Sequence, residues 1–362
     1  MKICLVISSL RSGGAERVAT TLANHWASKG WSITVITLAH RATDFYALDS
    51  SVRRIALDCV GASPSKVGGL LNNLRRLRVV RRALKTEKPD IALGFMPSVN
   101  IIIGLACLGT GIAAVGSEHI HPPMSPLEQP WRSLRRFVYP RLAAVSALTQ
   151  SSADWVRQHA GARRVPVMSN PIPYPLPDGE PRIEPELVIG RLTGGTTLLA
   201  VGRLAHQKGF DQLLDAFFAV RPLHPKWHLT ILGEGPLRDE LEQHRARLGL
   251  EDSVAIPGAA GNIGDWYETA DAYVMTSRFE GFGNTLAEAL CYGVPAVVVD
   301  CESGPREILR HEVDGLLVPP DDPQALVHAL DRLMGDAELR TRFAKRAVET
   351  QERFAVERIA SQ

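Results

Sequence analysis

The stretch Ile3-Cys-Leu-Val-Ile-Ser8, followed by Ser9-Leu-Arg-Ser-Gly13-Gly14-Ala15-Glu16, determines the fold class of this chain. A short β-branched run leads through a glycine-containing turn into a segment with helical periodicity, which is typical of a βα unit. The same alternation recurs throughout, with strands expected at residues 3–8, 32–38, 91–95 and 113–117, and then at 197–201, 228–232, 254–256, 272–276, 296–299 and 315–318. This pattern predicts an α/β protein whose parallel sheets are covered by helices on both faces.

A proline-rich stretch, Asn170-Pro-Ile-Pro-Tyr-Pro-Leu-Pro-Asp178, separates the two halves of the pattern. Proline at every second position keeps the backbone extended and removes N–H donors, so residues 171–190 are expected to form a linker. At roughly 100–200 residues per domain, a chain of 362 residues holds two domains. We therefore expect two Rossmann-like domains, residues 1–170 and 191–345, with ligands bound beyond the carboxyl ends of their strands in the cleft between them.

The composition, 45% hydrophobic and 22% charged, is that of a soluble globular protein. The net charge of +2 conceals a strong asymmetry. Residues 1–170 carry 22 Lys and Arg against 9 Asp and Glu, a net +13, whereas residues 171–362 carry 19 against 30, a net −11. This asymmetry predicts that the first half meets an anionic partner or surface. Five scattered cysteines without a C-x-x-C pair indicate neither a zinc site nor a disulfide framework, which fits a reducing cytosol.

Two glycine-containing turns follow predicted strands and could approach a phosphate. Gly13 and Gly14 precede a helix whose N-terminal N–H groups suit an anion, although such a pair is also common in simple tight turns. In the second half, Gly202-Arg203-Leu-Ala-His-Gln-Lys208-Gly209 places two cations five residues apart on one loop after a strand. Both cations could reach one diphosphate, or they could be two solvated charges.

A pair of glutamates lies around the turn after the strand at 272–276. Glu280 is expected on the loop, where it can reach substrate hydroxyls, whereas Glu288 is expected two turns into the following helix, where it can bind a ribose diol. Backbone N–H groups at the start of that helix are available to a phosphate, and they belong to Gly283, Asn284 and Thr285.

With these motifs, residues 1–360 resemble a family 4 glycosyltransferase of the GT-B fold. The resemblance also rests on Gly13-Gly14-Ala15-Glu16, Ile231-Leu-Gly233-Glu-Gly235, Gly304-Pro305-Arg306-Glu307 and Asp314-Gly315-Leu316-Leu317-Val318. It implies that the first domain binds the acceptor, that the second binds a nucleotide sugar, and that a C-terminal helix at 346–362 packs back toward the first domain.

The resemblance also implies roles for particular residues. Arg203 and Lys208 would neutralise the leaving nucleoside diphosphate, Glu280 would contact the donor sugar, and Glu288 would hold the ribose. His119, at the end of the strand at 113–117, matches the family's cleft histidine, so the expected catalytic residues are His119, Glu280, Arg203 and Lys208. The expected donor-binding residues are Gly13, Gly14, Gly202, Gly235, Phe282, Gly283, Asn284, Thr285 and Glu288.

The resemblance implies a reaction that retains the anomeric configuration, and the residue types fit a reaction that uses no metal. Two fixed cations and helix N–H groups can stabilise a departing diphosphate, and the sequence has no D-x-D motif to bind a metal ion. We therefore expect no metal and no cofactor, only a nucleotide-sugar co-substrate, with UDP as the nucleotide. In this interpretation a leaving phosphate oxygen accepts the acceptor's proton during same-face attack.

A basic helix is predicted at residues 72–88, where four cations at spacings of 3, 4 and 3 fall on one face: Arg75, Arg78, Arg82 and Lys85. Such a stripe can bind anionic headgroups or a pyrophosphate, or it can be a solvated face. The segment 131–141 also mixes aromatic residues with arginine. No nucleic-acid recognition motif accompanies the charge, so nucleic acid is not an expected partner.

These features are similar to the bacterial PglH-like subgroup, which extends undecaprenyl-diphosphate-linked oligosaccharides and holds the lipid pyrophosphate with basic residues of this helix. We place Glu118 with this acceptor site, and leave open whether it helps to deprotonate the acceptor. The hypothesis is a monomeric transferase of a hexose or N-acetylhexosamine to a polyprenyl-diphosphate-linked saccharide, in surface polysaccharide or glycan biosynthesis. It would be cytoplasmic, peripheral on the anionic inner face of the cytoplasmic membrane.

Three alternatives remain open from the residues. A soluble glycosyltransferase with a small acceptor would be indifferent to membranes and to the basic stripe. An NAD-dependent Rossmann oxidoreductase would need a G-x-G-x-x-G fingerprint, which is absent from the sequence. A non-catalytic carbohydrate-binding module would not need the Arg203, Lys208, Glu280 and Glu288 set.

Overall fold

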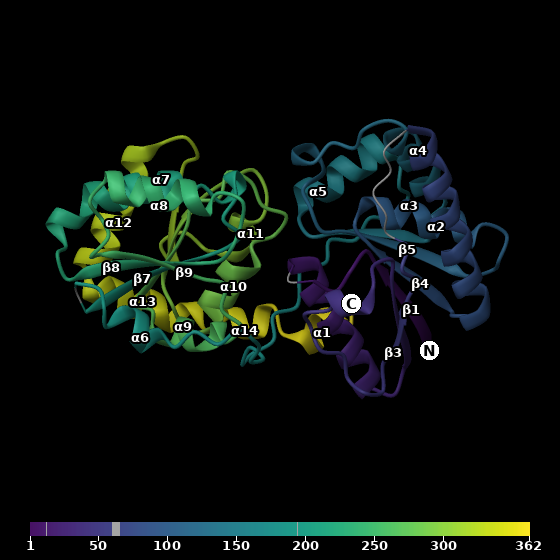
Figure 1. Cartoon of the computed structure of the whole chain (residues 1–362), viewed down its shortest axis with the longest axis horizontal. Helices are drawn as coiled ribbons and strands as arrows, with labels where there is room; N and C mark the ends of the chain where they lie inside the picture. The colour runs from purple at the N-terminus through teal and green to yellow at the C-terminus, as the bar shows by residue number, and fades with distance from the viewer. Residues whose placement is uncertain (12, 60–65, 194) are drawn as a thin grey trace. The chain divides into compact units, whose positions relative to one another are not determined.

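The structure is a computed structural model that describes residues 1–11, 13–59, 66–193 and 195–362, the side chains of residues 66–70 excepted (Figure 1). The chain divides into two compact units. Unit 1 comprises Met1–Pro171 together with Val356–Gln362, and unit 2 comprises Ile172–Ala355. Each unit contains one six-stranded sheet whose strands are all parallel, which confirms the predicted α/β class.

The sheet of unit 1 has the strand order β3-β2-β1-β4-β5-β6. Its strands are β1 (Lys2–Ile7), β2 (Ser32–Thr37), β3 (Arg53–Ala56), β4 (Ile91–Phe95), β5 (Ala113–Glu118) and β6 (Ala144–Ala147). The helices are α1 (Gly14–Ser28), α2 (Lys66–Glu87), α3 (Pro97–Cys107), α4 (Trp131–Val138), α5 (Gln150–Trp155) and α15 (Val356–Ala360). Side chains of β1 alternate between two cores: Leu5 packs with residues of α1, whereas Cys4 and Val6 pack with residues of α2 and α3. Helices therefore cover both faces of this sheet.

The last helix of the chain belongs to unit 1, where α15 packs against α1. The Nε1–H of Trp26 donates to the carbonyl oxygen of Ala360 over 3.1 Å, and Ile359 is buried. Residues 346–362 contain two short helices, α14 (Thr350–Arg353) and α15, rather than one continuous helix.

Unit 2 repeats this architecture with the strand order β12-β11-β10-β7-β8-β9. Its strands are β7 (Thr196–Val201), β8 (Trp227–Leu232), β9 (Val254–Gly258), β10 (Ala272–Met275), β11 (Ala296–Val299) and β12 (Gly315–Val318). Its other helices are α6 (Pro185–Ile189), α7 (Phe210–Val220), α8 (Arg238–Arg247), α9 (Ile263–Thr269), α10 (Asn284–Cys291), α11 (Pro305–Ile308), α12 (Pro323–Gly335) and α13 (Ala337–Ala347). The order places β7 beside β10 in the middle of the sheet. The loops that follow these two parallel strands therefore meet at the carboxyl end of the sheet.

Residues 171–184 form neither helix nor strand, residues 185–189 of the predicted linker form a helix, and from Ile172 on the stretch belongs to unit 2. Ile172 and Leu176 are buried, and their backbone N–H groups donate to the Phe354 carbonyl and the Tyr292 hydroxyl, each over 2.9 Å. The prolines remove N–H donors at alternate positions. The N–H groups of Ile172 and Leu176, which lie between prolines, donate to other parts of unit 2.

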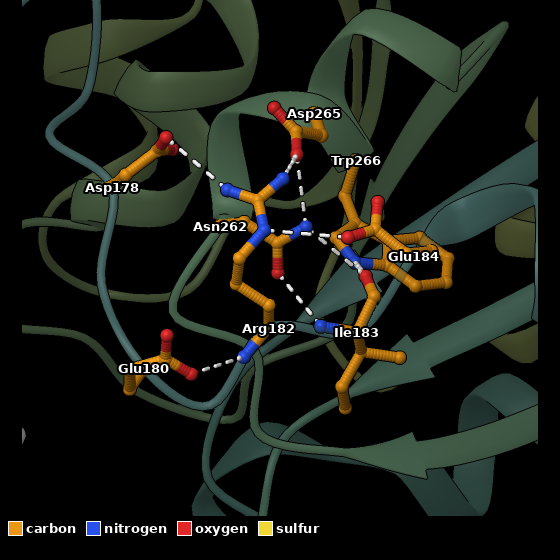
Figure 2. A network of polar contacts seen from close by, with 8 residues as sticks. All are labelled: Asp178, Glu180, Arg182, Ile183, Glu184, Asn262, Asp265 and Trp266. Atoms are coloured by element: carbon orange, nitrogen blue, oxygen red, sulfur yellow. Dashed lines mark hydrogen bonds and ion pairs between the residues drawn. The ribbon is translucent and has the colours of Figure 1, made fainter.

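Further along, the strap formed by residues 172–184 is held to α9 by a polar network (Figure 2). Asn262 is fully buried, and its side-chain amide accepts from the Ile183 N–H over 2.9 Å and donates to the Ile183 carbonyl over 3.1 Å. Trp266 Nε1 donates to the same carbonyl over 3.0 Å. At the surface, Arg182 reaches Asp265 over 2.9 Å, and it also pairs with Asp178 and Glu184.

Replacing Asn262 with alanine should destabilise unit 2 by about 1–3 kcal/mol, because the buried amide makes both backbone hydrogen bonds to Ile183. The measurement is the free energy of unfolding in denaturant. Arg182→Ala is the matched control. Its side chain is 41% exposed, so loss of its ion pairs should have a clearly smaller effect. Equal effects of the two substitutions would contradict this ranking.

Candidate active site

Three loops of unit 2 approach one another closely at the carboxyl ends of β7, β8 and β10. A Cβ atom built on Gly233 would lie 1.8 Å from the Gly202 carbonyl oxygen, and one on Gly235 would lie 2.3 Å from the Leu204 carbonyl oxygen. Only glycine allows the backbones to pass at these distances. Gly209 has φ +64°, and a Cβ there would meet the Thr276 carbonyl oxygen at 2.2 Å, which fixes the loop after β7 against the end of β10.

This arrangement brings Lys208 and Glu280 together. Lys208 Nζ lies 2.6 Å from Glu280 Oε1, and the Ser277 hydroxyl donates to the same oxygen over 2.6 Å. The two charged side chains are only 16% and 8% exposed, so the ion pair is largely desolvated. The sequence predicted both residues but assigned them separate tasks, whereas the structure joins them in one network. Arg203, on the same loop, is exposed, and its side chain has no ion pair or hydrogen bond to any residue the structure describes.

The second glutamate lies inside the helix that begins after the next turn. Gly283, at φ +111°, precedes α10, and Glu288 is nearly fully buried within that helix. The Tyr267 hydroxyl donates to Glu288 Oε2 over 3.1 Å, and the Tyr273 hydroxyl donates to Thr285 Oγ1 over 2.8 Å. These two tyrosines were not predicted from the sequence, because they come from α9 and β10 and only the fold brings them to α10.

Phe282, predicted among the donor-binding residues, points into the interior. It is 2% exposed, and its ring contacts that of Phe354 edge-on with centroids 5.3 Å apart. The backbone beside it is nevertheless tightly constrained, since a Cβ on Gly304 would lie 2.2 Å from the Phe282 carbonyl oxygen. Any contact of this residue with a ligand would therefore come from its backbone.

In unit 1, the predicted turn at Gly13 and Gly14 opens α1. Gly13 is extended at φ −147° and α1 begins at Gly14. A Cβ on Gly13 would lie 2.3 Å from Glu16 Oε2, so this glutamate folds back over the turn. Burial raises the pKa of Glu16, whereas a hydrogen bond from Ser9 opposes the shift.

His119 lies directly after β5, at the carboxyl end of the unit 1 sheet. Its ring stacks on Phe95, with centroids 5.0 Å apart, and its Nε2 lies 2.9 Å from Ser117 Oγ. Burial lowers the pKa of His119 to about 4, so the ring is neutral at physiological pH.

Glu118 does not face solvent, in contrast to its predicted place in the acceptor site. The alternation of side chains along β5 turns it to the opposite side from Ser117 and His119, where it is 1% exposed. The Tyr139 hydroxyl donates to Glu118 Oε1, and the buried Arg135 guanidinium lies 4.5 Å above the Trp155 ring. Burial raises the pKa of Glu118 from 4.5 to about 7, and the Tyr139 hydrogen bond and the Arg135 charge oppose this shift.

The raised pKa of Glu118 predicts a pH-dependent loss of stability. Between about pH 4.5 and 7 the unfolded chain releases the Glu118 proton while the folded chain keeps it, so stability falls as the pH rises through this window. Relative to Glu118→Gln, the wild type should lose about 3 kcal/mol of unfolding free energy between pH 5 and 8, at about 1.4 kcal/mol per pKa unit. Denaturant unfolding at the two pH values measures this, and Glu128→Gln, at an exposed position, is the control. An unchanged difference between wild type and Glu118→Gln would contradict a buried, protonated Glu118.

The basic stripe forms as predicted on α2, with all four side chains exposed: Arg75, Arg78, Arg82 and Lys85. A shallow depression of about 340 Å³ is lined by Arg78, Arg82, Lys85 and two neighbours. The neighbouring Arg81 is engaged elsewhere, since it donates to the carbonyl oxygens of Ala106 and Leu108. Leu71 and Leu74, on the same helix, are 62% and 40% exposed.

Among the described residues, no group of three or more His, Cys, Asp or Glu side chains is arranged to bind a metal ion. Within the same described ranges, we find no helix that combines the length and the apolar character needed to span a lipid bilayer.

Two family models match the chain in succession. Residues 12–174 match the model described as Glycosyltransferase Family 4, and residues 188–350 match the model described as Glycosyl transferases group 1. Together the two models cover most of both units.

Similar proteins include two bacterial relatives. The chain is 36% identical, over 97% of its length, to the exopolysaccharide phosphotransferase SCO2592 of Streptomyces coelicolor, but it spans only 38% of that protein. It is 29% identical, over 99% of its length and 96% of the relative's, to a Campylobacter jejuni transferase. The name of that enzyme is GalNAc-alpha-(1->4)-GalNAc-alpha-(1->3)-diNAcBac-PP-undecaprenol alpha-1,4-N-acetyl-D-galactosaminyltransferase.

Solved structures resemble the whole chain. Anabaena HepE in complex with UDP superposes with a TM-score of 0.79, at 21% identity, over 100% of this chain and 98% of that one. This likeness confirms the predicted GT-B fold.

Proposed function

The chain belongs to glycosyltransferase family 4, and from this premise we propose that it transfers a hexose or N-acetylhexosamine from a UDP-linked sugar to a polyprenyl-diphosphate-linked saccharide. The observation that carries the donor half of this proposal is the convergence of Lys208, Glu280 and Ser277 at the adjacent ends of β7 and β10. Ligands of open parallel sheets bind beyond the carboxyl ends of the strands. That HepE has been crystallised with UDP supports a uridine nucleotide.

In this proposal each residue meets a separate part of the nucleotide sugar. Lys208 and the exposed Arg203 neutralise the diphosphate as it departs, and N–H groups at the start of α10 add to this stabilisation. Glu280 contacts the sugar and Glu288 binds the ribose. The ion pair with Glu280 holds the Lys208 side chain in place, so this side chain should lose little entropy on binding the diphosphate.

The transfer itself retains the anomeric configuration and uses no metal. The bond between the anomeric carbon and the diphosphate oxygen breaks, and a bond to the acceptor hydroxyl oxygen forms on the same face. The acceptor's proton passes to an oxygen of the leaving phosphate. The protein therefore supplies fixed positive charge rather than a nucleophile, and removing divalent cations should leave transfer intact.

The acceptor half rests on the stripe of Arg75, Arg78, Arg82 and Lys85. All four side chains are exposed, and the three guanidinium groups among them are suited to bidentate binding of a diphosphate. The exposed Leu71 and Leu74 on the same helix fit contact with the inner face of a membrane that carries such a lipid. The name of the Campylobacter relative, a transferase acting on an undecaprenol-PP saccharide, supports this acceptor class, and a place in surface polysaccharide or glycan synthesis follows from it.

The test is a transfer assay with purified full-length monomer, a panel of UDP- and GDP-sugars, and a polyprenyl-diphosphate disaccharide in anionic vesicles. We expect transfer from one UDP-sugar to the lipid acceptor, unchanged by EDTA. Transfer only to a small water-soluble acceptor would overturn the lipid assignment. Binding of a nicotinamide cofactor without sugar transfer would overturn the donor assignment.

A further inference from the structure

A chain of three polar side chains lies at the carboxyl end of the unit 1 sheet. Ser146 Oγ donates to Ser117 Oγ over 2.9 Å, and Ser117 Oγ lies 2.9 Å from His119 Nε2. The backbone geometry explains why they meet. Ser117 and His119 are two residues apart and so lie on one side of the strand direction, and Ser146 is the register partner of Ser117 on β6.

The surroundings hold the histidine ring in one orientation. Phe95 stacks on it at an interplanar angle of 21°. Asn100, fully buried in α3, accepts from the Ser117 N–H over 3.2 Å and donates to the Ser117 carbonyl over 3.1 Å. The backbone that carries Ser117 is therefore fixed, and its hydroxyl lies between Ser146 Oγ and His119 Nε2.

The contacts of Ser117 favour one position for the histidine proton. Ser117 Oγ accepts the Ser146 proton and has a lone pair left for an Nε2–H, but its own proton and Nδ1 would then both lack a partner among the described residues. With Nε2 as the acceptor of the Ser117 proton, only Nδ1 lacks a partner there, so this arrangement is favoured. A neutral imidazole with an acceptor Nε2 carries its proton on Nδ1. Nδ1 of His119 is buried and has no hydrogen-bond partner among the residues the structure describes.

We infer that Ser146 and Ser117 are positioning residues that hold His119 as the Nδ1–H tautomer, so that the histidine serves as a hydrogen-bond donor to an oxygen of the sugar substrate. The role toward the sugar rests on the proposed function, whereas the tautomer does not. A buried N–H without an acceptor costs free energy, and a substrate oxygen would satisfy it on binding. His119 in this arrangement is not a general base, because the nitrogen that could accept a proton is already bonded to Ser117.

The tautomer is measured directly on the full-length chain labelled with ¹⁵N-histidine, by long-range ¹H–¹⁵N correlation at neutral pH, with His119→Gln to assign the signals. We expect His119 to show a protonated Nδ1 and an unprotonated Nε2. Ser117→Ala should move the proton toward Nε2 and lower kcat about 10-fold, the scale of one lost hydrogen bond. Ser117→Thr, which keeps the hydroxyl, should restore both readouts.

Ser152→Ala is the matched control, because it removes a hydroxyl 2.8 Å from Nδ1 of another histidine, His121. It should alter the His121 signals and leave those of His119 unchanged. Should Ser117→Ala fail to fold, Ser146→Ala tests the same series of hydrogen bonds. This variant should give a mixture of both His119 tautomers. A wild-type His119 protonated on Nε2 would overturn the inference. A protein with the expected tautomer but no sugar transfer would refute the proposed function and leave the serine pair's role intact.

Discussion

Lys208→Met should lower kcat for sugar transfer by about 10³-fold, the upper range for loss of one fixed group that stabilises developing negative charge. In the structure, Lys208 Nζ is bound to Glu280 and is only 16% exposed, so its charge acts in a medium that screens poorly. Methionine preserves much of the side chain's length while removing the charge. Steady-state kinetics with the UDP-sugar, together with UDP affinity by calorimetry, measure the effect.

The ion pair provides a further check on this expectation. Glu280→Gln should also lower kcat strongly, and the double variant should be little worse than either single one, because paired residues act as a unit. Arg332→Met is the control: it removes a cation paired with Glu312 at the exposed surface of unit 2 and should leave kcat within about 2-fold. Unchanged UDP affinity in Lys208→Met would undermine the donor-site assignment as a whole.

The triple variant Arg75→Gln, Arg78→Gln and Arg82→Gln should lower kcat/KM for the polyprenyl-diphosphate acceptor by about 10³-fold. Three charge-assisted hydrogen bonds at about 1.5 kcal/mol each account for this loss. Slow hydrolysis of the UDP-sugar in the absence of acceptor should persist, because the proposed donor residues Lys208, Glu280 and Glu288 lie in unit 2, whereas the three arginines lie on α2 of unit 1. Comparing transfer with donor hydrolysis therefore separates a damaged acceptor site from a damaged protein.

A second triple variant controls for net charge. Arg342→Gln, Lys345→Gln and Arg346→Gln remove the same number of exposed cations from one helix, α13 of unit 2, and should leave transfer unchanged. If both triple variants weaken transfer equally, the loss comes from overall charge rather than from the stripe. If neither does, the acceptor is a small molecule, as in the first alternative considered from the sequence.

Residues whose positions follow from local spacing were predicted well. The exposure of Arg75, Arg78, Arg82 and Lys85 follows from helical periodicity alone, and α2 presents them as expected. The strands predicted in the second half all form, because β-branched runs bounded by turn residues specify them locally. The GT-B fold was predicted from the order of the motifs, since no periodicity distinguishes it from other parallel α/β folds.

Features that depend on strand order or register were missed. The Lys208–Glu280 contact requires β10 to lie beside β7, although the two residues are 72 positions apart. β6 was not predicted, since Ala-Val-Ser-Ala has weak strand propensity, and without it Ser146 could not be placed beside Ser117. The burial of Glu118 was also missed, although the alternation of side chains along β5 turns Glu118 to the side opposite Ser117.

Because α15 belongs to unit 1, it limits which segments of this protein can be exchanged with those of relatives in a chimeric protein. Unit 1 is discontinuous in sequence, so residues 1–171 expressed alone would lack the helix that packs on α1 and bonds Trp26. The strap at 172–184, by contrast, is bonded to unit 2 through Asn262 and should be exchanged with it. A chimera that changes the donor sugar should therefore replace residues 172–355 as one insert, with junctions after Pro171 and before Val356.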